Sequence, residues 1–252
     1  MTSAPSNPWI VKLRPNPRAA LRLVCFPYAG GTASAFRTWP DGLPGDVEVL
    51  AIQPPGRETR SRERPFDQLA PLVTALVDAI AAQLTGPFAI YGHSLGSLIA
   101  FEFARELRRR GLGAPLHLFA SGRRAPQIPD RDPGHELPDR EFWDWLRRFG
   151  GMPDALFQEP ELMAYFLPLL RADVAVNRSP IEDEAPLSCP ITAMGGLADP
   201  RVTIEALDAW RVQTTAAFDR ELFAGGHFYI QSARAEVLRS LSRRLARWRD
   251  SR

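Results

Sequence analysis

Short hydrophobic runs alternate along the chain with longer segments in which hydrophobic residues recur every three or four positions. The short runs are bounded by Gly or Pro and are mostly β-branched or aromatic, which is typical of strands buried in a mainly parallel sheet. They cover residues 21–26, 47–52, 88–91, 116–120, 191–194 and 220–223. The periodic segments predict helices over residues 69–84, 97–110 and 235–248. Strands that alternate with helices predict an α/β fold in which helices flank a mainly parallel sheet.

One long segment interrupts this alternation. Residues 123–187 lack a strand pattern, and a Pro- and Asp-rich stretch leads there into two amphipathic helices at about 139–149 and 159–176. A helical insertion between two strands is expected to form a lid over a site at the sheet edge, and simple packing on the sheet is the alternative. We therefore expect one domain over residues 1–252 with a helical lid insertion at about 123–187.

Composition narrows the class of protein. The chain has 252 residues, of which 45% are hydrophobic and 24% charged, as in ordinary globular proteins. A formal net charge of +2 is too balanced to indicate nucleic acid as the main partner. Residues 1–20 contain four prolines and predict an extended lead-in instead of a secretory signal, and no run of 18 apolar residues indicates a membrane span. We expect a monomeric cytoplasmic protein, in which Cys25 and Cys189 are buried and unpaired and bind no metal.

The strongest chemical signal is the sequence GHSLG at residues 92–96. A Gly-x-Ser-x-Gly match alone is weak, but this one follows a predicted strand and precedes a predicted helix. Ser94 therefore lies at a strand-to-helix turn, as the nucleophile elbow of the α/β-hydrolase fold requires. The strained turn raises the serine hydroxyl above the sheet edge, and the two glycines allow strand and helix to approach closely. The alternative is a buried glycine-rich turn with an incidental serine.

A serine nucleophile needs a base. Of the four histidines, His93 lies inside the elbow and is expected to point away from the Ser94 hydroxyl, His117 begins a predicted strand and His135 lies in the insertion. His227 follows the last predicted strand through three small residues, and α/β active sites gather at such carboxyl ends of strands. His227 is the predicted base, and a surface-loop histidine is the alternative.

The base needs an acid to orient it. Asp199 stands just after the strand at 191–194 and between the serine and the histidine, in the order expected for this fold. Other acidic residues in the interval, among them Asp173, belong to the insertion or its exit. Asp199 is the predicted acid of a Ser-His-Asp triad, and an ordinary Asp-Pro turn is the alternative.

Two backbone N–H groups are expected to bind the oxyanion of a tetrahedral intermediate. One belongs to Leu95, the residue after the nucleophile, and the other to the loop PYAGG at residues 27–31, where Ala29 is the chosen donor. A phosphate-binding role for this loop is weak because the sequence lacks the Gly-Lys-Ser/Thr ending.

Taken together, these motifs resemble those of the type II thioesterases, the editing enzymes of polyketide synthases and nonribosomal peptide synthetases. The resemblance rests on FPYAGG at 26–31, QPPGR at 53–57, GHSLG at 92–96, ADP at 198–200 and GGHF at 225–228. Within the insertion, LPD at 137–139, FGG at 149–151 and LRAD at 170–173 are similar to the lid segment of the family.

The resemblance implies hydrolysis of acyl thioesters on the phosphopantetheine arm of acyl or peptidyl carrier domains, without a cofactor. It implies that Ser94 attacks the thioester, that His227 acts as base and then acid, and that Asp199 orients it. It also places Tyr28 and Phe228 at the substrate-binding site. A carboxylesterase or acyltransferase on the same scaffold, and a non-catalytic protein that binds carriers, remain alternatives.

Overall fold

A seven-stranded sheet forms the centre of the molecule. A computed structural model describes residues 7–129, 134–148, 150, 152 and 154–249 of the chain. The strand order is β1-β3-β2-β4-β5-β6-β7, and every neighbouring pair is parallel except β1 with β3. The strands are β1 (Ile10–Lys12), β2 (Leu21–Phe26), β3 (Val47–Ile52), β4 (Phe88–His93), β5 (Leu118–Ser121), β6 (Ile191–Gly196) and β7 (Phe218–Phe223). The predicted α/β fold with a mainly parallel sheet is confirmed.

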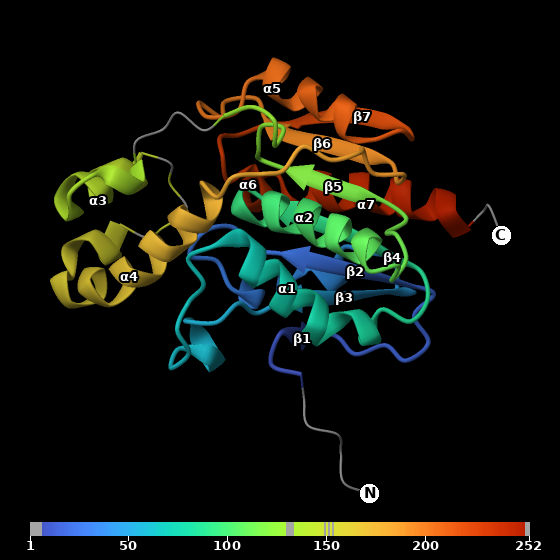
Figure 1. Cartoon of the computed structure of the whole chain (residues 1–252), viewed down its shortest axis with the longest axis horizontal. Coiled ribbons are helices and arrows are strands. Elements are labelled where there is room, and N and C mark those ends of the chain that lie inside the picture. Colours follow the sequence, from blue (N-terminus) through green and yellow to red (C-terminus); the bar gives the residue numbers. More distant parts are fainter. Residues whose placement is uncertain (1–6, 130–133, 149, 151, 153, 250–252) are drawn as a thin grey trace, which may run out of the picture.

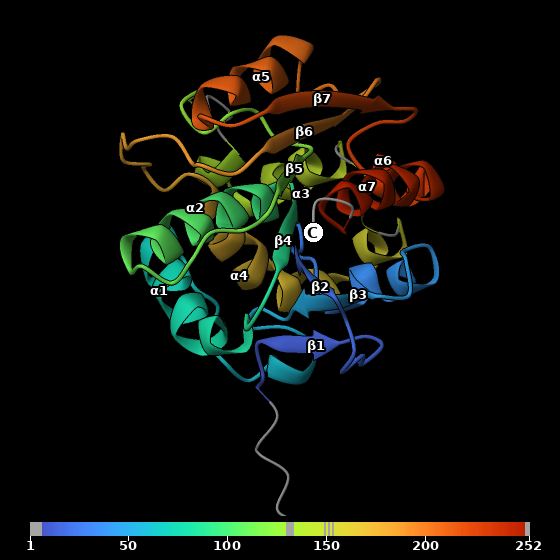
Figure 2. The same cartoon turned by 90° about the vertical axis from the view of Figure 1, so that its right-hand side faces the viewer.

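Helices cover both faces of this sheet. They are α1 (Leu69–Ile80), α2 (Leu95–Arg109), α3 (Asp139–Arg147), α4 (Pro160–Asn177), α5 (Ile204–Asp208), α6 (Tyr229–Ser232) and α7 (Arg234–Arg249). Figure 2 looks along the sheet and shows α1, α2 and α5 on one face and α6 and α7 on the other. No helix in the described ranges is long and apolar enough to cross a membrane.

Alternation along each strand divides the core into two parts. In β2, Val24 and Phe26 pack with α1 and α2, whereas Leu23 and Cys25 pack with α7 on the opposite face. Successive side chains of a strand point to opposite faces, so a strand covered on both sides must be hydrophobic throughout. This explains why the strands of this chain appear as continuous apolar runs.

Several bounds differ from the predicted elements: α1 ends at Ile80 instead of residue 84, and β5, β6 and β7 differ by up to two residues at one or both ends. Residues 10–12, within the predicted lead-in, form the edge strand β1, which pairs antiparallel with β3. The strand before the nucleophile continues to His93, which pairs with Ser121 of β5, and α2 begins at Leu95 instead of residue 97. The turn between them is therefore tighter than the sequence indicated.

The insertion between β5 and β6 carries α3 and α4, which lie beyond the carboxyl ends of the strands (Figure 1). The two helices have a hydrophobic cluster of their own, in which Phe142 and Trp145 of α3 pack with Leu170 and Val174 of α4. Residues 130–133, 149, 151 and 153 lie outside the described residues, including Phe149 at the end of the first predicted insertion helix and Gly151 of the FGG motif.

Both cysteines are free and buried, as predicted. Burial raises the pKa of the Cys25 thiol and raises that of Cys189 to about 12. Because the thiolate is the reactive form of cysteine, neither side chain is suited to act as a nucleophile at neutral pH.

Candidate active site

Ser94 is the single residue between β4 and α2. Its φ of 54° is one that residues other than glycine seldom adopt. The Ser94 N–H donates to the carbonyl oxygen of Ser121 at 2.7 Å, and the buried Ser97 hydroxyl lies within 2.8 Å of the carbonyl oxygens of Gly92 and Ser121. The strained turn is thus held by the neighbouring strand and by the first turn of its own helix.

Two glycines allow this turn to fit. A Cβ on Gly92 would lie 2.1 Å from the carbonyl oxygen of Gly96, and a Cβ on Gly96 would lie 2.2 Å from that of Phe26 at the end of β2. Both distances are far below van der Waals contact, so these positions require glycine. The close approach at Gly96 brings the loop at residues 27–31 next to the start of α2.

His227 and Asp199 come together from the loops after β7 and β6. Nδ1 of His227 lies 2.7 Å from Oδ2 of Asp199, and the two side chains are 4% and 0% exposed. The other carboxylate oxygen of Asp199 accepts the N–H of Arg201 at 2.9 Å. A histidine that donates its Nδ1 proton to a buried carboxylate keeps Nε2 as the proton acceptor.

The backbones of these two loops are joined directly. The N–H of Leu197 donates to the carbonyl oxygen of Phe223 at 2.8 Å, and that of Ala198 donates to Gly225 at 2.9 Å. These bonds continue the parallel pairing of β6 and β7 past the ends of the strands. They place the acid and the histidine at a fixed separation without help from the insertion.

Ser94 and His227 line the same two neighbouring cavities. The larger one has a volume of about 60 Å³ and has walls from both the sheet edge and the insertion. It is lined by Tyr28, Ala29, Ser94, Leu146, Gly150, Met152, Leu170, Arg201, His227 and Phe228. The side chain of Leu95 is buried and does not line this cavity. Its N–H is the first backbone N–H group of α2.

The loop after β2 contributes backbone N–H groups to this site. The Gly30 N–H donates to Oδ2 of Asp173 at 2.7 Å, and the Gly31 N–H donates to the carbonyl oxygen of Tyr28 at 2.8 Å. No acceptor within the described part of the chain takes the N–H of Ala29. Asp173 is the residue that sequence reasoning missed, because it lies in the insertion, far from this loop in sequence.

His93 is fully buried next to the site, and its ring is engaged by neighbouring side chains. Its Nδ1 is 2.8 Å from the hydroxyl of Ser121, and its ring packs against those of His227 and Phe228. Burial, followed by the charge of His227, lowers the pKa of His93 well below its ordinary value. His93 is therefore neutral at physiological pH and packs as part of the buried support, as expected from its place in the elbow.

Basic side chains surround the smaller cavity. Arg123, Arg124 and Arg201 line it together with Ser94 and His227. Arg201 also lies over the ring of Trp145 in α3, 5.6 Å from its centroid. No group of three His, Cys, Asp or Glu side chains among the described residues is arranged to hold a metal ion.

The fold and this geometry define a hydrolase of the α/β-hydrolase class. Comparison with known proteins is more specific, because the family model described as a thioesterase domain matches residues 21–245. The chain belongs to the thioesterase family, and it is an enzyme that hydrolyses thioesters, as the sequence predicted.

Individual relatives match over nearly the full length. The gramicidin S biosynthesis protein GrsT of Aneurinibacillus migulanus is 43% identical over 241 residues, which cover 95% of this chain and 94% of that protein. Among solved structures, RedJ, a thioesterase from the prodiginine pathway of Streptomyces coelicolor, has a TM-score of 0.84 and 44% identity over 89% of this chain and 85% of its own. BorB, the type II thioesterase from the borrelidin biosynthetic cluster, has a TM-score of 0.81 and 33% identity over 93% and 95%.

Proposed function

We propose that the chain removes aberrant or stalled acyl groups from the phosphopantetheine arm of carrier domains during polyketide or nonribosomal peptide biosynthesis. The observation that carries the proposal is the buried His227–Asp199 hydrogen bond beside a cavity that Ser94 shares with His227. The relatives named for gramicidin S, prodiginine and borrelidin biosynthesis support the choice of carrier-bound substrates.

Catalysis proceeds through an acyl-enzyme. Nε2 of His227 takes the proton of the Ser94 hydroxyl as Oγ attacks the thioester carbonyl carbon, and the buried carboxylate of Asp199 stabilises the imidazolium that forms. The thiolate then leaves with the proton from His227. A water molecule, deprotonated by the same nitrogen, attacks the carbonyl carbon of the acyl-serine ester. The bond to Oγ then breaks, His227 returns the proton to Ser94, and the carboxylic acid is released.

Backbone groups stabilise the charge that develops on the carbonyl oxygen. The N–H of Leu95 at the start of α2 and the N–H of Ala29 form the oxyanion hole in this mechanism. The helix also contributes the positive end of its dipole at this position. The N–H of Ala29 has no acceptor among the described residues, so it is available to the substrate, which supports its assignment.

The insertion acts as a lid in this proposal. Leu146, Met152 and Leu170 form an apolar wall opposite the sheet edge, and Tyr28 and Phe228 form the facing wall with their rings 4.9 Å apart. Such walls would hold an acyl chain away from water while the thioester lies near Ser94. We place the enzyme in the cytoplasm. We also propose that it is a monomer, and gel filtration at several protein concentrations would test this oligomeric state.

A substrate panel tests the proposed activity. Acyl carrier proteins, acyl-N-acetylcysteamine thioesters and p-nitrophenyl esters of the same acids would be compared by kcat/KM. We expect the carrier-bound thioesters to be preferred. A preference for oxygen esters without carrier deacylation would favour a carboxylesterase, acyl transfer to an added alcohol or amine would favour an acyltransferase, and failure of a fluorophosphonate to label Ser94 would favour a non-catalytic role.

A further inference from the structure

A buried ion pair links the insertion to the loop after β3. The guanidinium of Arg57 makes two hydrogen bonds of 2.8 Å to the carboxylate of Asp173 in α4, and the two side chains are 5% and 7% exposed. The partners are 116 positions apart in sequence. Neither residue lines the cavities that contain Ser94.

Both members of this pair also bond to the loop that carries Ala29. Oδ2 of Asp173 accepts the N–H of Gly30 at 2.7 Å, and Nη1 of Arg57 donates to the carbonyl oxygen of Gly31 at 3.2 Å. Leu170, one turn before Asp173, packs so closely on Gly30 that a Cβ there would meet it at 2.9 Å. The loop is therefore held at successive peptide groups.

Arg57 is itself held in place by its surroundings. Its Nε donates to the carbonyl oxygen of Pro55 at 3.3 Å, and its own carbonyl oxygen accepts from Nε2 of Gln53 at 3.1 Å. The side-chain oxygen of Gln53 in turn accepts the N–H of Ala33 at 3.1 Å. The ion pair is thus anchored on both sides of the loop and has little freedom to shift.

Stability alone is a weak reason for such a pair. Removing two charges from water costs several kcal/mol, and replacing a buried ion pair by apolar residues of similar size is often neutral or stabilising. What the carboxylate supplies, and an apolar side chain cannot, is a fixed acceptor for the Gly30 N–H. The N–H groups of Gly30 and Gly31 both donate hydrogen bonds within the protein. Among residues 29–31, the N–H of Ala29 is therefore the one left to bind an oxyanion.

We propose that Asp173 and Arg57 are positioning residues that aim the Ala29 N–H at the oxyanion of the tetrahedral intermediate. This rests on the proposed function, in which Ala29 supplies half of the oxyanion hole. The pair acts on the transition state and not on the bound substrate, since the donor strengthens only as charge develops on the oxygen. Because Asp173 belongs to α4, the helix of the insertion also determines the geometry of the catalytic centre.

The variant Asp173→Asn tests the proposal. With the amide oxygen in place of Oδ2, the new side chain still accepts from Gly30 but turns its NH2 group toward Nη2 of Arg57. With the amide turned over, the Gly30 N–H loses its acceptor, so either orientation weakens the support of the loop. We expect kcat to fall about 10- to 100-fold, less than the loss of a complete oxyanion donor, while KM changes less than about 3-fold. Arg57→Lys, which keeps the charge but loses the paired geometry, is expected to give a smaller loss in the same direction.

Inhibition by a transition-state analogue provides a second measurement. It would not change if the Arg57–Asp173 pair only stabilised the fold. An acyl trifluoromethyl ketone forms a hemiketal with Ser94, and its oxyanion occupies the same hole. Its inhibition constant should rise across the variants by the same factor by which kcat/KM falls, while binding of the product acid stays constant. If the variants lose activity without weaker inhibition by the ketone, the pair does not position the oxyanion donor.

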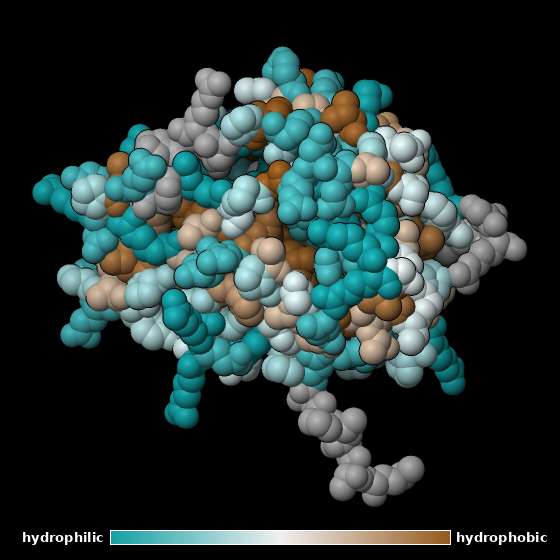
Figure 3. Space-filling view, in the orientation of Figure 1, coloured by the Kyte–Doolittle hydropathy of each residue, from teal (hydrophilic) through white to brown (hydrophobic). Residues whose placement is uncertain are grey.

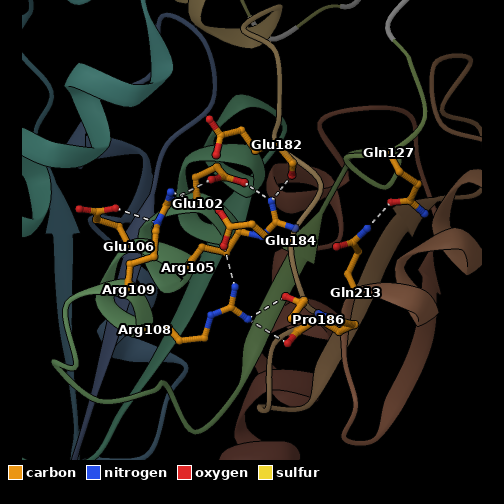
Figure 4. A network of polar contacts seen from close by, with 11 residues as sticks. Glu102, Arg105, Glu106, Arg108, Arg109, Gln127, Glu182, Glu184, Pro186 and Gln213 are labelled. Carbon is orange, nitrogen blue, oxygen red and sulfur yellow. Dashed lines mark hydrogen bonds and ion pairs between the residues drawn. The ribbon is translucent and has the colours of Figure 1, made fainter.

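A second buried ion pair serves as the matched control. Arg105 and Glu102 of α2 are 2.9 Å apart with side chains 2% and 11% exposed, in the network that joins α2 to residues 182–186 (Figure 4). In the view of Figure 1, the surface over α2 is hydrophilic (Figure 3). Glu102→Gln is expected to lower the melting temperature without changing kcat or ketone inhibition.

The double variant Arg57→Met/Asp173→Leu keeps the test decisive if Asp173→Asn does not fold. Apolar replacement removes the unpaired charge, so we expect a folded protein with kcat still reduced about 10-fold or more. Near-normal kcat in this folded variant would overturn the proposal. Failure of the wild-type protein to hydrolyse thioesters would instead overturn the proposed function, which separates the two outcomes.

Discussion

Oδ2 of Asp199 lies 2.7 Å from Nδ1 of His227, and both side chains are buried between loops whose backbones are hydrogen-bonded to each other. A histidine in an exposed loop would change its ring orientation freely. Here the carboxylate selects one orientation and one tautomer of the ring before any substrate is present. In the proposed mechanism, this relationship prepares His227 to act as the base.

Asp199→Asn should disturb the orientation and tautomer of the His227 ring without unfolding the protein. The amide can donate a hydrogen bond to Nδ1, which favours the tautomer that carries its proton on Nε2 and cannot accept one from serine. We expect kcat to fall by about 10³- to 10⁴-fold with KM little changed. Steady-state kinetics measures this, with Asp208→Asn, which breaks a half-exposed ion pair to Arg220, as the control. A loss below about 10-fold would show that Asp199 does not orient the base.

Gly96→Ala should damage the elbow itself. The new methyl group would lie 2.2 Å from the carbonyl oxygen of Phe26 and 2.6 Å from that of Pro27, and neither backbone group can move without displacing the end of β2. We expect unfolding to become easier by about 3 kcal/mol or more, and activity to fall in the protein that remains folded. Urea denaturation measures the first effect.

Gly45→Ala is the matched control for that prediction. A Cβ on Gly45 would meet nothing within 4 Å, and its φ is not positive. Its stability should change by less than about 1 kcal/mol. Equal stability of the two variants would contradict the close packing of α2 on the end of β2.

Phe228→Ala should alter the choice of acyl chain. The ring of Phe228 packs edge-on against Tyr28 and lines the cavity beside Ser94. Loss of this apolar wall is expected to lower kcat/KM for long acyl chains about 10-fold and to affect acetyl substrates least. The measurement is kcat/KM across acyl-N-acetylcysteamine thioesters of increasing length. An equal loss for every length would mean that Phe228 does not contact the acyl chain.

His117 should make the folded state sensitive to acid. Burial, followed by the charge of Arg244, lowers the pKa of His117 to about 4, and its Nε2 lies 2.8 Å from the Thr192 hydroxyl. Between an unfolded pKa of about 6.5 and pH 4, the unfolded chain binds a proton at His117 that the folded chain does not. The free energy of unfolding therefore falls as the pH falls through this window, by about 2 kcal/mol between pH 7 and pH 5 from this residue.

His117→Gln should remove that share of the pH dependence. Glutamine keeps a polar group near Thr192 but does not titrate. Urea denaturation of both proteins at pH 7 and pH 5 gives the comparison, and the variant should lose about 2 kcal/mol less than the wild type. The same loss in both proteins would show that His117 is not held neutral by the fold.

Much of the fold followed from local patterns. The strands at 21–26 and 47–52 match their predicted bounds to the residue, because a strand covered on both faces is continuously apolar and ends at a change in composition. The edge strand β1 was missed because its three residues are held by pairing with β3, which no local pattern reveals. The start of α2 was placed late because glycine is a poor helix former, and close packing outweighs that preference at Gly96.

The proposed catalytic residues Ser94, Asp199 and His227 were chosen from the sequence because each follows a strand in the order this fold requires, and all three lie at the carboxyl ends of the strands. The contacts that residues of the insertion make with the loops at the sheet edge were not predictable in this way. In the sequence, Asp173 was one acid of the insertion within LRAD at 170–173, and Arg57 was part of QPPGR at 53–57, with nothing to connect them. Their pairing across 116 positions depends on how α4 returns over the sheet edge, which is a property of the assembled fold.

The most direct test of the account is the mass of an acylated carrier domain, followed over time with wild-type protein and with Ser94→Ala. The wild type should remove the acyl group and leave the free phosphopantetheine arm. Ser94→Ala should do so at least about 10⁴-fold more slowly, although it unfolds at the same temperature, because the attacking oxygen is gone. Deacylation of the carrier by Ser94→Ala at a rate near that of the wild type would contradict the account.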